Sequence, residues 1–119
     1  MEGVRRGNFD DAEPESPYPG VVSSSFDSAG ATVTRYRFAA GARFPRHRHD
    51  QEQLTMIVDG TVTFTVGDEE QQLGPGDWSM VPGGVEHGLR AGDTGAVFLA
   101  VVVPRRDHAR AYAVVEEDA

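Results

Sequence analysis

Residues 41–53 read GARFPRHRHDQEQ and place a histidine on either side of one arginine. In an extended strand, side chains at i and i+2 point to the same face, and their Cα atoms lie roughly 6 to 7 Å apart. His47 and His49 can therefore bind one metal ion, while Arg46 and Arg48 point to the opposite face. This segment indicates a metal site on one face of a strand.

Two further side chains can complete the ligand set. A bend after His49 would start the next strand at Gln53, whose amide oxygen could return over the same face. His87 follows a Pro-x-Gly turn later in the chain and can supply a fourth ligand. Glu52 would face away from Gln53 on the same strand. Neutral imidazole suits zinc, iron, nickel, copper and manganese to different degrees, so the pattern predicts a site and leaves its metal open.

The rest of the chain has the pattern of an all-β protein. Short runs rich in β-branched and aromatic residues are separated by Gly, Pro and Asp, and they span 31–38, 53–58, 61–66, 78–81 and 96–103. Several short strands at this spacing favour a sandwich or a barrel. The dipeptide Asp59-Gly60 is typical of a two-residue turn, and we expect it to join two of these strands as a hairpin.

Three segments follow from this organisation. We expect an acidic, proline-rich N-terminal arm over 1–20, a barrel over 21–104, and a C-terminal tail over 105–119. The runs 54–58 and 96–103 are apolar on both faces. In a chain of 119 residues this predicts that they are covered by a second subunit, as in a homodimer, or by the N-terminal arm.

Composition excludes several classes of chemistry. The chain has no cysteine, and all 11 basic residues are arginine, which excludes thiolate, iron-sulfur and Schiff-base lysine chemistry. A net charge of -8 argues against a nucleic-acid partner, because nucleic-acid binding depends on basic contacts to phosphate. No apolar run is long enough to cross a membrane as a helix, and the N-terminus has no apolar signal core. We therefore expect a soluble, cytoplasmic protein that binds a small molecule.

Two motifs resemble those of the cupin superfamily. The first has a fixed spacing of Gly, His-x-His, Glu and Gly, with Gln in the place of Glu here, and its positions are Gly41, His47, His49, Gln53 and Gly60. The second runs from Gly through Pro-x-Gly to His and Asn, with Ala91 in the place of Asn, and its positions are Gly76, Pro82, Gly84 and His87. Together the motifs span a little under half of the chain.

The resemblance implies a double-stranded β-helix, the jelly-roll barrel of RmlC-like proteins. It also implies a divalent metal ion, such as zinc, nickel, manganese or iron, held in the barrel mouth by His47, His49, Gln53 and His87. Three imidazoles and an amide are neutral, so the ion would keep its full double charge. We expect such a site to favour a small anionic ligand, a carboxylate or an enolate, and to act as a Lewis acid.

A narrower resemblance is to the small cupins of pectin and alginate breakdown, which convert 4,5-unsaturated monouronates to their linear keto form. It depends on His-x-His-x3-Gln, on Gly76-Asp77 and on the ending 104–107. Arg105 stands where that group has its arginine, and it is the candidate catalytic residue. Together with Arg106 it could bind a substrate carboxylate, or both could be a solvated strand end. The group has an acidic residue in its last barrel strand, whereas 96–103 reads AVFLAVVV.

We therefore predict a metal-dependent cupin enzyme that carries out an isomerase or lyase type of step on a small, oxygen-rich acid, in sugar-acid metabolism. Three alternatives remain open. The chain could act like the cupins that close rings in aromatic polyketides. It could be a cupin dioxygenase, which would require a redox-active metal with an open coordination position. It could also be a ligand-binding cupin without catalysis.

Overall fold

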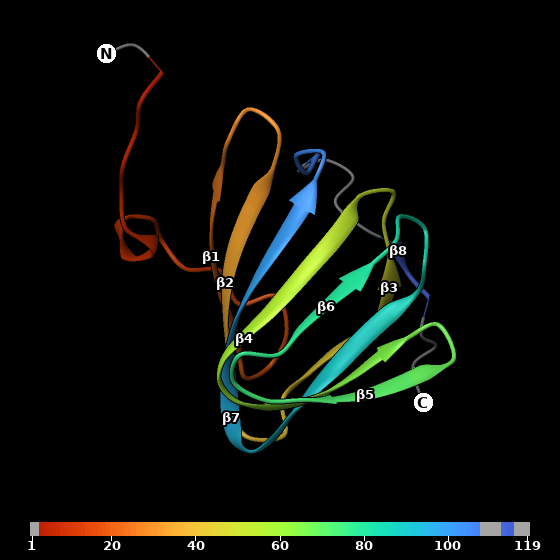
Figure 1. Ribbon diagram of the computed structural model, residues 1–119. Helices are drawn as coiled ribbons and strands as arrows, with labels where there is room; N and C mark the ends of the chain where they lie inside the picture. The colour runs from red at the N-terminus through yellow and green to blue at the C-terminus, as the bar shows by residue number, and fades with distance from the viewer. Residues whose placement is uncertain (1–2, 108–112, 116–119) are drawn as a thin grey trace.

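The computed structural model describes residues 3–107 and 113–115, and almost all regular structure in them is β (Figure 1). One short 3-10 helix, η1 (Phe9–Asp11), precedes the strands. The strands are β1 (Val21–Asp27), β2 (Thr32–Phe38), β3 (Arg43–Arg48), β4 (Glu52–Val66), β5 (Glu69–Leu73), β6 (Trp78–Val81), β7 (His87–Val103) and β8 (Ala113–Val114). The expected all-β jelly-roll barrel is confirmed.

The two longest strands, β4 and β7, organise the barrel. They pair antiparallel along nearly their whole length. The first part of β7 also pairs with β3, and its second part pairs with β2. The first part of β4 pairs with β6, and its last part pairs with β5. Each long strand therefore belongs to both halves of one curled sheet, and the two halves enclose the interior (Figure 1).

The expected hairpin at Asp59-Gly60 is wrong. β4 continues through both residues, and its register with β7 shifts on either side of them. Gly60 has φ 73°, and a Cβ there would lie 2.0 Å from the carbonyl oxygen of Gly95 on β7. A glycine with positive φ suits a bulge as well as a turn. The two-residue hairpin lies at Gly67-Asp68 instead, where Val66 pairs with Glu69.

The interior has an apolar end and a polar end. Aromatic side chains fill the apolar end, where the ring of Phe98 stacks on Tyr36 at 5.1 Å and lies 5.2 Å from Phe38. At the other end, β2 and β4 begin with inward threonines that are almost fully buried, Thr32, Thr34 and Thr55. Because a buried polar group needs a hydrogen-bond partner, this polar end is where a polar site can be built.

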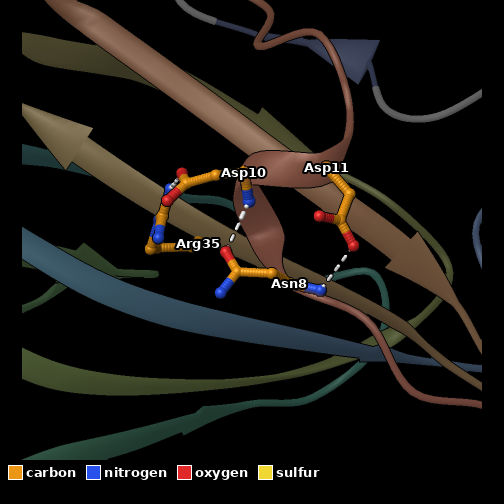
Figure 2. A network of polar contacts seen from close by, with 4 residues as sticks. All are labelled: Asn8, Asp10, Asp11 and Arg35. Atoms are coloured by element: carbon orange, nitrogen blue, oxygen red, sulfur yellow. Dashed lines mark hydrogen bonds and ion pairs between the residues drawn. The ribbon is translucent and has the colours of Figure 1, made fainter.

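Part of the N-terminal arm packs on the outer face of β1 and β2. In Figure 2, the side chain of Asn8 accepts a hydrogen bond from the backbone of Asp10, and its own backbone donates to Asp11. Asp10 also forms an ion pair with Arg35 on β2. The ring of Phe9 lies 5.2 Å from the Arg35 guanidinium. These contacts attach η1 to the barrel.

At the other end of the chain, β8 pairs with the end of β3, so two residues of the expected tail extend the sheet. Among the described residues, no helix has the length and apolar character that crossing a membrane would require.

The outer face of β4, β6 and β7 carries exposed apolar side chains that none of the described residues covers. Ile57, with 3% exposure, faces the interior, as its inward strand position predicts. Its outward neighbour Val58 is 55% exposed, and Trp78 and Met80 on β6 are 67% and 52% exposed. The N-terminal arm is attached to β1 and β2, so η1 covers the neighbouring part of this sheet.

Candidate metal centre

Three histidines converge at the polar end of the barrel. His47 on β3 and His87 at the start of β7 are direct partners across the sheet, with ring centroids 4.2 Å apart. His49 follows β3, and its ring centroid lies 4.8 Å from that of His87. One possible ligand atom from each histidine lies within 4.8 Å of the others. His47 and His87 are 6% and 1% exposed, so the cluster faces inward.

Backbone carbonyls determine which ring nitrogen of each histidine carries the proton. In all three rings Nδ1 lies at hydrogen-bond distance from a carbonyl oxygen, and a carbonyl can only accept. The three pairs are His47 with Pro45 at 2.8 Å, His49 with Gln51 at 3.0 Å and His87 with Val85 at 2.9 Å. Nδ1 is therefore the donor in each ring, and in the neutral imidazole the lone pair is on Nε2.

Gln53 brings a fourth lone pair to the same place. Its Oε1 lies 3.0 Å from Nε2 of His49 and 3.2 Å from Nε2 of His87. The amide nitrogen of Gln53 donates to Oγ1 of Thr55 at 3.0 Å, which turns the oxygen toward the histidines. Thr55 is fully buried. Where the ring is neutral and protonated on Nδ1, its Nε2 lone pair faces the lone pairs of Oε1 at this distance.

Burial keeps the two innermost imidazoles neutral. Desolvation and, to a smaller extent, the neighbouring His87 lower the pKa of His47 from 6.5 to about 3. Desolvation also lowers the pKa of His87 to about 4, and the hydrogen bond to Val85 opposes this shift. Both rings are therefore uncharged at neutral pH, and no second proton occupies Nε2.

The donor set fits a divalent cation. A cation placed among three imidazole nitrogens and an amide oxygen would relieve the repulsion between their lone pairs, and these donors are ones that first-row divalent metals accept. Within residues 3–107 and 113–115, no carboxylate joins the set. Glu52 is exposed on the outward face of β4, and Glu86 lies 3.9 Å from Arg46 and from Arg48 on the outside. The structure brings together all four predicted ligands, and metal binding by them stays a prediction.

Arg106 lies near this centre. It is half-buried, and its backbone N–H donates to Oγ1 of the buried Thr32 at 2.9 Å. Its positive charge is one of the causes that lower the pKa of His47. Arg105, the predicted catalytic residue, is exposed, and a catalytic role for it stays a prediction.

Sequence reasoning missed Thr55 as part of the site. Thr55 orients the Gln53 amide, and the available signal was its place two residues further along the same strand, on the same face. The second half of β7, residues 96–103, adds no inward acid or base to the site. Its inward residues are Ala96, Phe98, Ala100 and Val102, which agrees with the apolar run seen in the sequence.

Comparison with known sequences identifies relatives of this chain. Residues 34–103 match the family model described as Cupin domain. The β-alanine degradation protein BauB from Pseudomonas aeruginosa is 36% identical over 72 residues, which cover 58% of this chain and 76% of BauB. The dimethylsulfoniopropionate lyase DddQ from Ruegeria pomeroyi is 36% identical over 69 residues, which cover 57% of this chain and 33% of DddQ. The match thus spans about a third of DddQ.

Solved structures show the same fold. KdgF from a Halomonas species superposes with a TM-score of 0.77 at 24% identity, over 84% of this chain and 94% of KdgF. Because the identity is low, this likeness concerns the fold alone. The family model covers more than half of the chain and includes His47, His49, Gln53 and His87. The resemblance read from the motifs is thus confirmed, and the protein belongs to the cupin family.

Proposed function

We propose that this cupin is a metal-dependent enzyme that binds a small, oxygen-rich acid at the barrel mouth and carries out an isomerase or lyase type of step. His47, His49, Gln53 and His87 would hold a divalent ion through three Nε2 atoms and Oε1. The ion, when bound, supplies Lewis-acid polarisation of a substrate oxygen. The observation that carries the proposal is the convergence of the His47, His49 and His87 side chains, with possible ligand atoms within 4.8 Å of one another, and of the Gln53 Oε1 beside two of them.

The neutral ligand set favours an anionic substrate. Among the described residues, no carboxylate belongs to the histidine cluster, so an ion held there by neutral donors would keep a net positive charge in a low-dielectric interior. The whole chain has a net charge of -8 and would not attract an acid by itself. Arg106, whose charge reaches His47, provides a second local attraction, and the exposed Arg105 beside it could pair with the same carboxylate.

The names of the two relatives support a small carboxylate as substrate. Dimethylsulfoniopropionate and β-alanine are both three-carbon carboxylates with a substituent on the β carbon, and elimination of that substituent is a lyase reaction. The resemblance to the cupins that ketonise unsaturated monouronates also points to a carboxylate, next to an enol. We therefore expect the substrate to present a carboxylate and a second oxygen or leaving group within a few bonds.

The test starts with the metal. Elemental analysis of the purified protein, followed by calorimetric titration of the chelator-treated protein with zinc, nickel, manganese and iron(II), should show one ion per chain. Failure of all four ions to bind would overturn the proposal. Iron in the purified protein, together with oxygen consumption on addition of a substrate, would instead favour the dioxygenase alternative.

Substrate assays then distinguish the enzymatic alternatives. Loss of the absorbance of 4,5-unsaturated monouronates would indicate ketonisation, and release of dimethyl sulfide from dimethylsulfoniopropionate would indicate a lyase. Either activity should disappear with chelator and return with the metal. Ring closure of an aromatic polyketide precursor, with no activity on the acids, would favour the cyclase alternative.

A non-catalytic role is the second candidate, and a specific observation favours it. The inward residues of the second half of β7 are all alanine, phenylalanine or valine, so this half of the strand offers no group for proton transfer. Under this alternative, small carboxylates would bind the metal-loaded protein and leave it unchanged. Binding measured by calorimetry without turnover of any acid in the panel would support it.

The expected homodimer also belongs to this proposal. The outward side chains of Val58, Trp78 and Met80 form an apolar face that a second copy would cover. Light scattering after gel filtration should give twice the chain mass. Trp78→Glu should shift the protein to a monomer while leaving metal binding unchanged, because Trp78 points away from the centre. A monomeric wild-type protein would contradict the dimer.

A further inference from the structure

Thr32 joins two distant parts of the chain at the barrel mouth. It is the first residue of β2, it is fully buried, and it stands directly opposite Asp27, the last residue of β1. Its hydroxyl oxygen lies 2.5 Å from Oδ1 of Asp27 and 2.9 Å from the backbone nitrogen of Arg106, which is 74 residues away in the sequence. Thr32 therefore connects the β1–β2 hairpin to the segment that follows β7.

The direction of both hydrogen bonds follows from the groups involved. A backbone N–H can only donate, so Arg106 donates to Oγ1 of Thr32. An ionised carboxylate can only accept, so the hydroxyl of Thr32 donates to Asp27. Hydrogen bonds in a chain polarise one another, and the carboxylate thereby makes the Thr32 oxygen a stronger acceptor. Asp27 thus acts on Arg106 through Thr32.

The segment that carries Arg106 has little regular structure to hold it. Residues 104–107 follow β7 directly and lie outside any strand. Within residues 3–107 and 113–115, Thr32 is the partner of the Arg106 backbone N–H. Without the Thr32 oxygen this N–H would lose its acceptor, and the segment could move away from the histidines.

The side chain of Arg106 is placed to bind a ligand. It is half-buried, and its charge contributes to lowering the pKa of His47, so it acts on the histidine cluster from across the mouth. It also lines a hollow of about 350 Å³ beside Ser23 and Ser25 of β1. In the described part of the chain, its guanidinium makes no ion pair or hydrogen bond. A guanidinium in this state is suited to pair with a carboxylate.

Three carboxylates line the same hollow, and none of them forms an ion pair with Arg106 in the described ranges. Asp27 accepts the hydrogen bond from Thr32. Glu13 and Glu15 are exposed on the N-terminal arm, where water and salt screen their charges. These acids therefore leave the guanidinium available to a ligand at the mouth.

We propose that Thr32 is a positioning residue that determines specificity for acids. It holds Arg106 so that the guanidinium binds one carboxylate of the substrate while another substrate oxygen binds at the metal centre. This inference rests on the proposed function, because it concerns the acid that the proposed enzyme binds. It assigns the carboxylate to Arg106 and leaves the exposed Arg105 without that role.

The test compares malonate, with two carboxylates, and monomethyl malonate, with one, in calorimetric titrations of the metal-loaded protein. The wild type should prefer malonate, because malonate keeps a carboxylate for Arg106 when the other binds at the metal centre. Arg106→Gln and Thr32→Val should each lower this preference at least about threefold, since a charged fork is lost or displaced. Thr32→Ser keeps the hydroxyl and should restore the preference.

Thr34→Val is the matched control. Thr34 is a second buried threonine of β2, and its hydroxyl lies 2.7 Å from that of Ser25. Its replacement removes a comparable buried hydrogen bond and should leave the preference for malonate unchanged. If Thr32 acts through Arg106, Thr32→Val should have no further effect in an Arg106→Gln background. Equal effects of Thr32→Val and Thr34→Val, or full additivity in the double variant, would overturn the positioning role.

Two NMR measurements on the wild type need no substitution, so they hold even if Thr32→Val does not fold. The amide of Arg106 should exchange with solvent more slowly than that of its neighbour Arg105, because only the first donates to a buried hydroxyl. Malonate should also shift the Nε signal of Arg106 in the metal-loaded protein. The absence of either result would contradict the inference.

The outcomes distinguish this inference from the proposed function. If the metal-loaded protein binds malonate and Thr32→Val does not change the preference, the metal site stands and the role of Thr32 is wrong. If no divalent ion binds, the proposed function is wrong and this inference falls with it.

Discussion

The inner and outer faces of β3 and β7 carry different kinds of side chain, with histidines inside and arginines outside. Inward, His47 and His87 are buried, and burial keeps them neutral although they are ionisable. Outward, Arg46 and Arg90 are exposed. Alternation along a strand separates the two sets, and burial then decides the protonation of the inner set. The inner face is therefore suited to a cation, whereas the outer face of the same strands carries arginines.

The largest expected effect comes from removing one inner ligand. His47→Ala should weaken metal binding by at least about 100-fold, since even the loss of a group that only orients a ligand costs tenfold to a hundredfold. Calorimetric titration of the chelator-treated protein would measure it. Arg48→Ala changes the outward neighbour and should alter the affinity less than threefold. Comparable losses in both variants would show that the two faces are not separated as described.

Acid should destabilise the metal-free protein through the inner face. Folding lowers the pKa of His87 from 6.5 to about 4 and that of His47 from 6.5 to about 3. Between pH 6.5 and pH 3 the unfolded chain therefore binds more protons than the folded chain does. Stability should therefore fall as the pH decreases from 6.5 toward 3, with a loss of roughly 2 kcal/mol at pH 5 from His87 alone.

Urea unfolding at pH 7 and pH 5 would measure this loss. A His47→Gln variant removes one titrating ring and should lose less stability than the wild type over the same interval. An identical loss in the two proteins would assign the acid sensitivity to other groups.

A smaller effect is expected from the residue that orients the amide. Thr55→Val keeps the shape of the side chain but removes the oxygen that accepts from Gln53. We expect metal affinity to fall about tenfold, because the amide can then turn its nitrogen toward the histidines. Thr34→Val changes another buried threonine of the polar end and serves as the control. Unchanged metal affinity in Thr55→Val would contradict the orienting role.

The smallest expected effect tests the charge of the centre. Gln53→Glu should raise metal affinity, since a carboxylate binds the ion more strongly than an amide does. It should lower the affinity of the loaded protein for acetate a few-fold, because one unit of charge is cancelled. Calorimetry with the metal and then with acetate measures both changes. If acetate binds both proteins equally, the neutral ligand set does not select for anions.

Much of the site could be predicted from residue spacing. His47 and His49 share a face because of the two-residue period of a strand, and Gln53 lies at a distance that a short bend can span. The position of Thr55 followed the same rule and was overlooked. Arg106 could not be distinguished from Arg105, because the path of the chain after β7 determines which guanidinium lies near His47.

The Asp59-Gly60 error has a related cause. Positive φ at a glycine is a local property, and both a hairpin turn and a bulge satisfy it. The close approach of β7 at Gly95 is a non-local contact, and it selects the bulge. A pattern read over a few residues contains no information about that contact.

The sequence by itself determined the alternation of side chains, the shared face of His47 and His49, and the all-β class, because these depend on a period that repeats every two residues. Gln53 and His87 were predicted as further ligands from the motif spacing, and metal binding by the four residues stays a prediction. The tertiary structure alone decided that His87 stands beside His47, that Thr55 turns the amide, and that Arg43 stands opposite Arg90 on the outer face. The physical reason is that strand pairing joins residues distant in the chain. Burial at those junctions then sets the charge of each group.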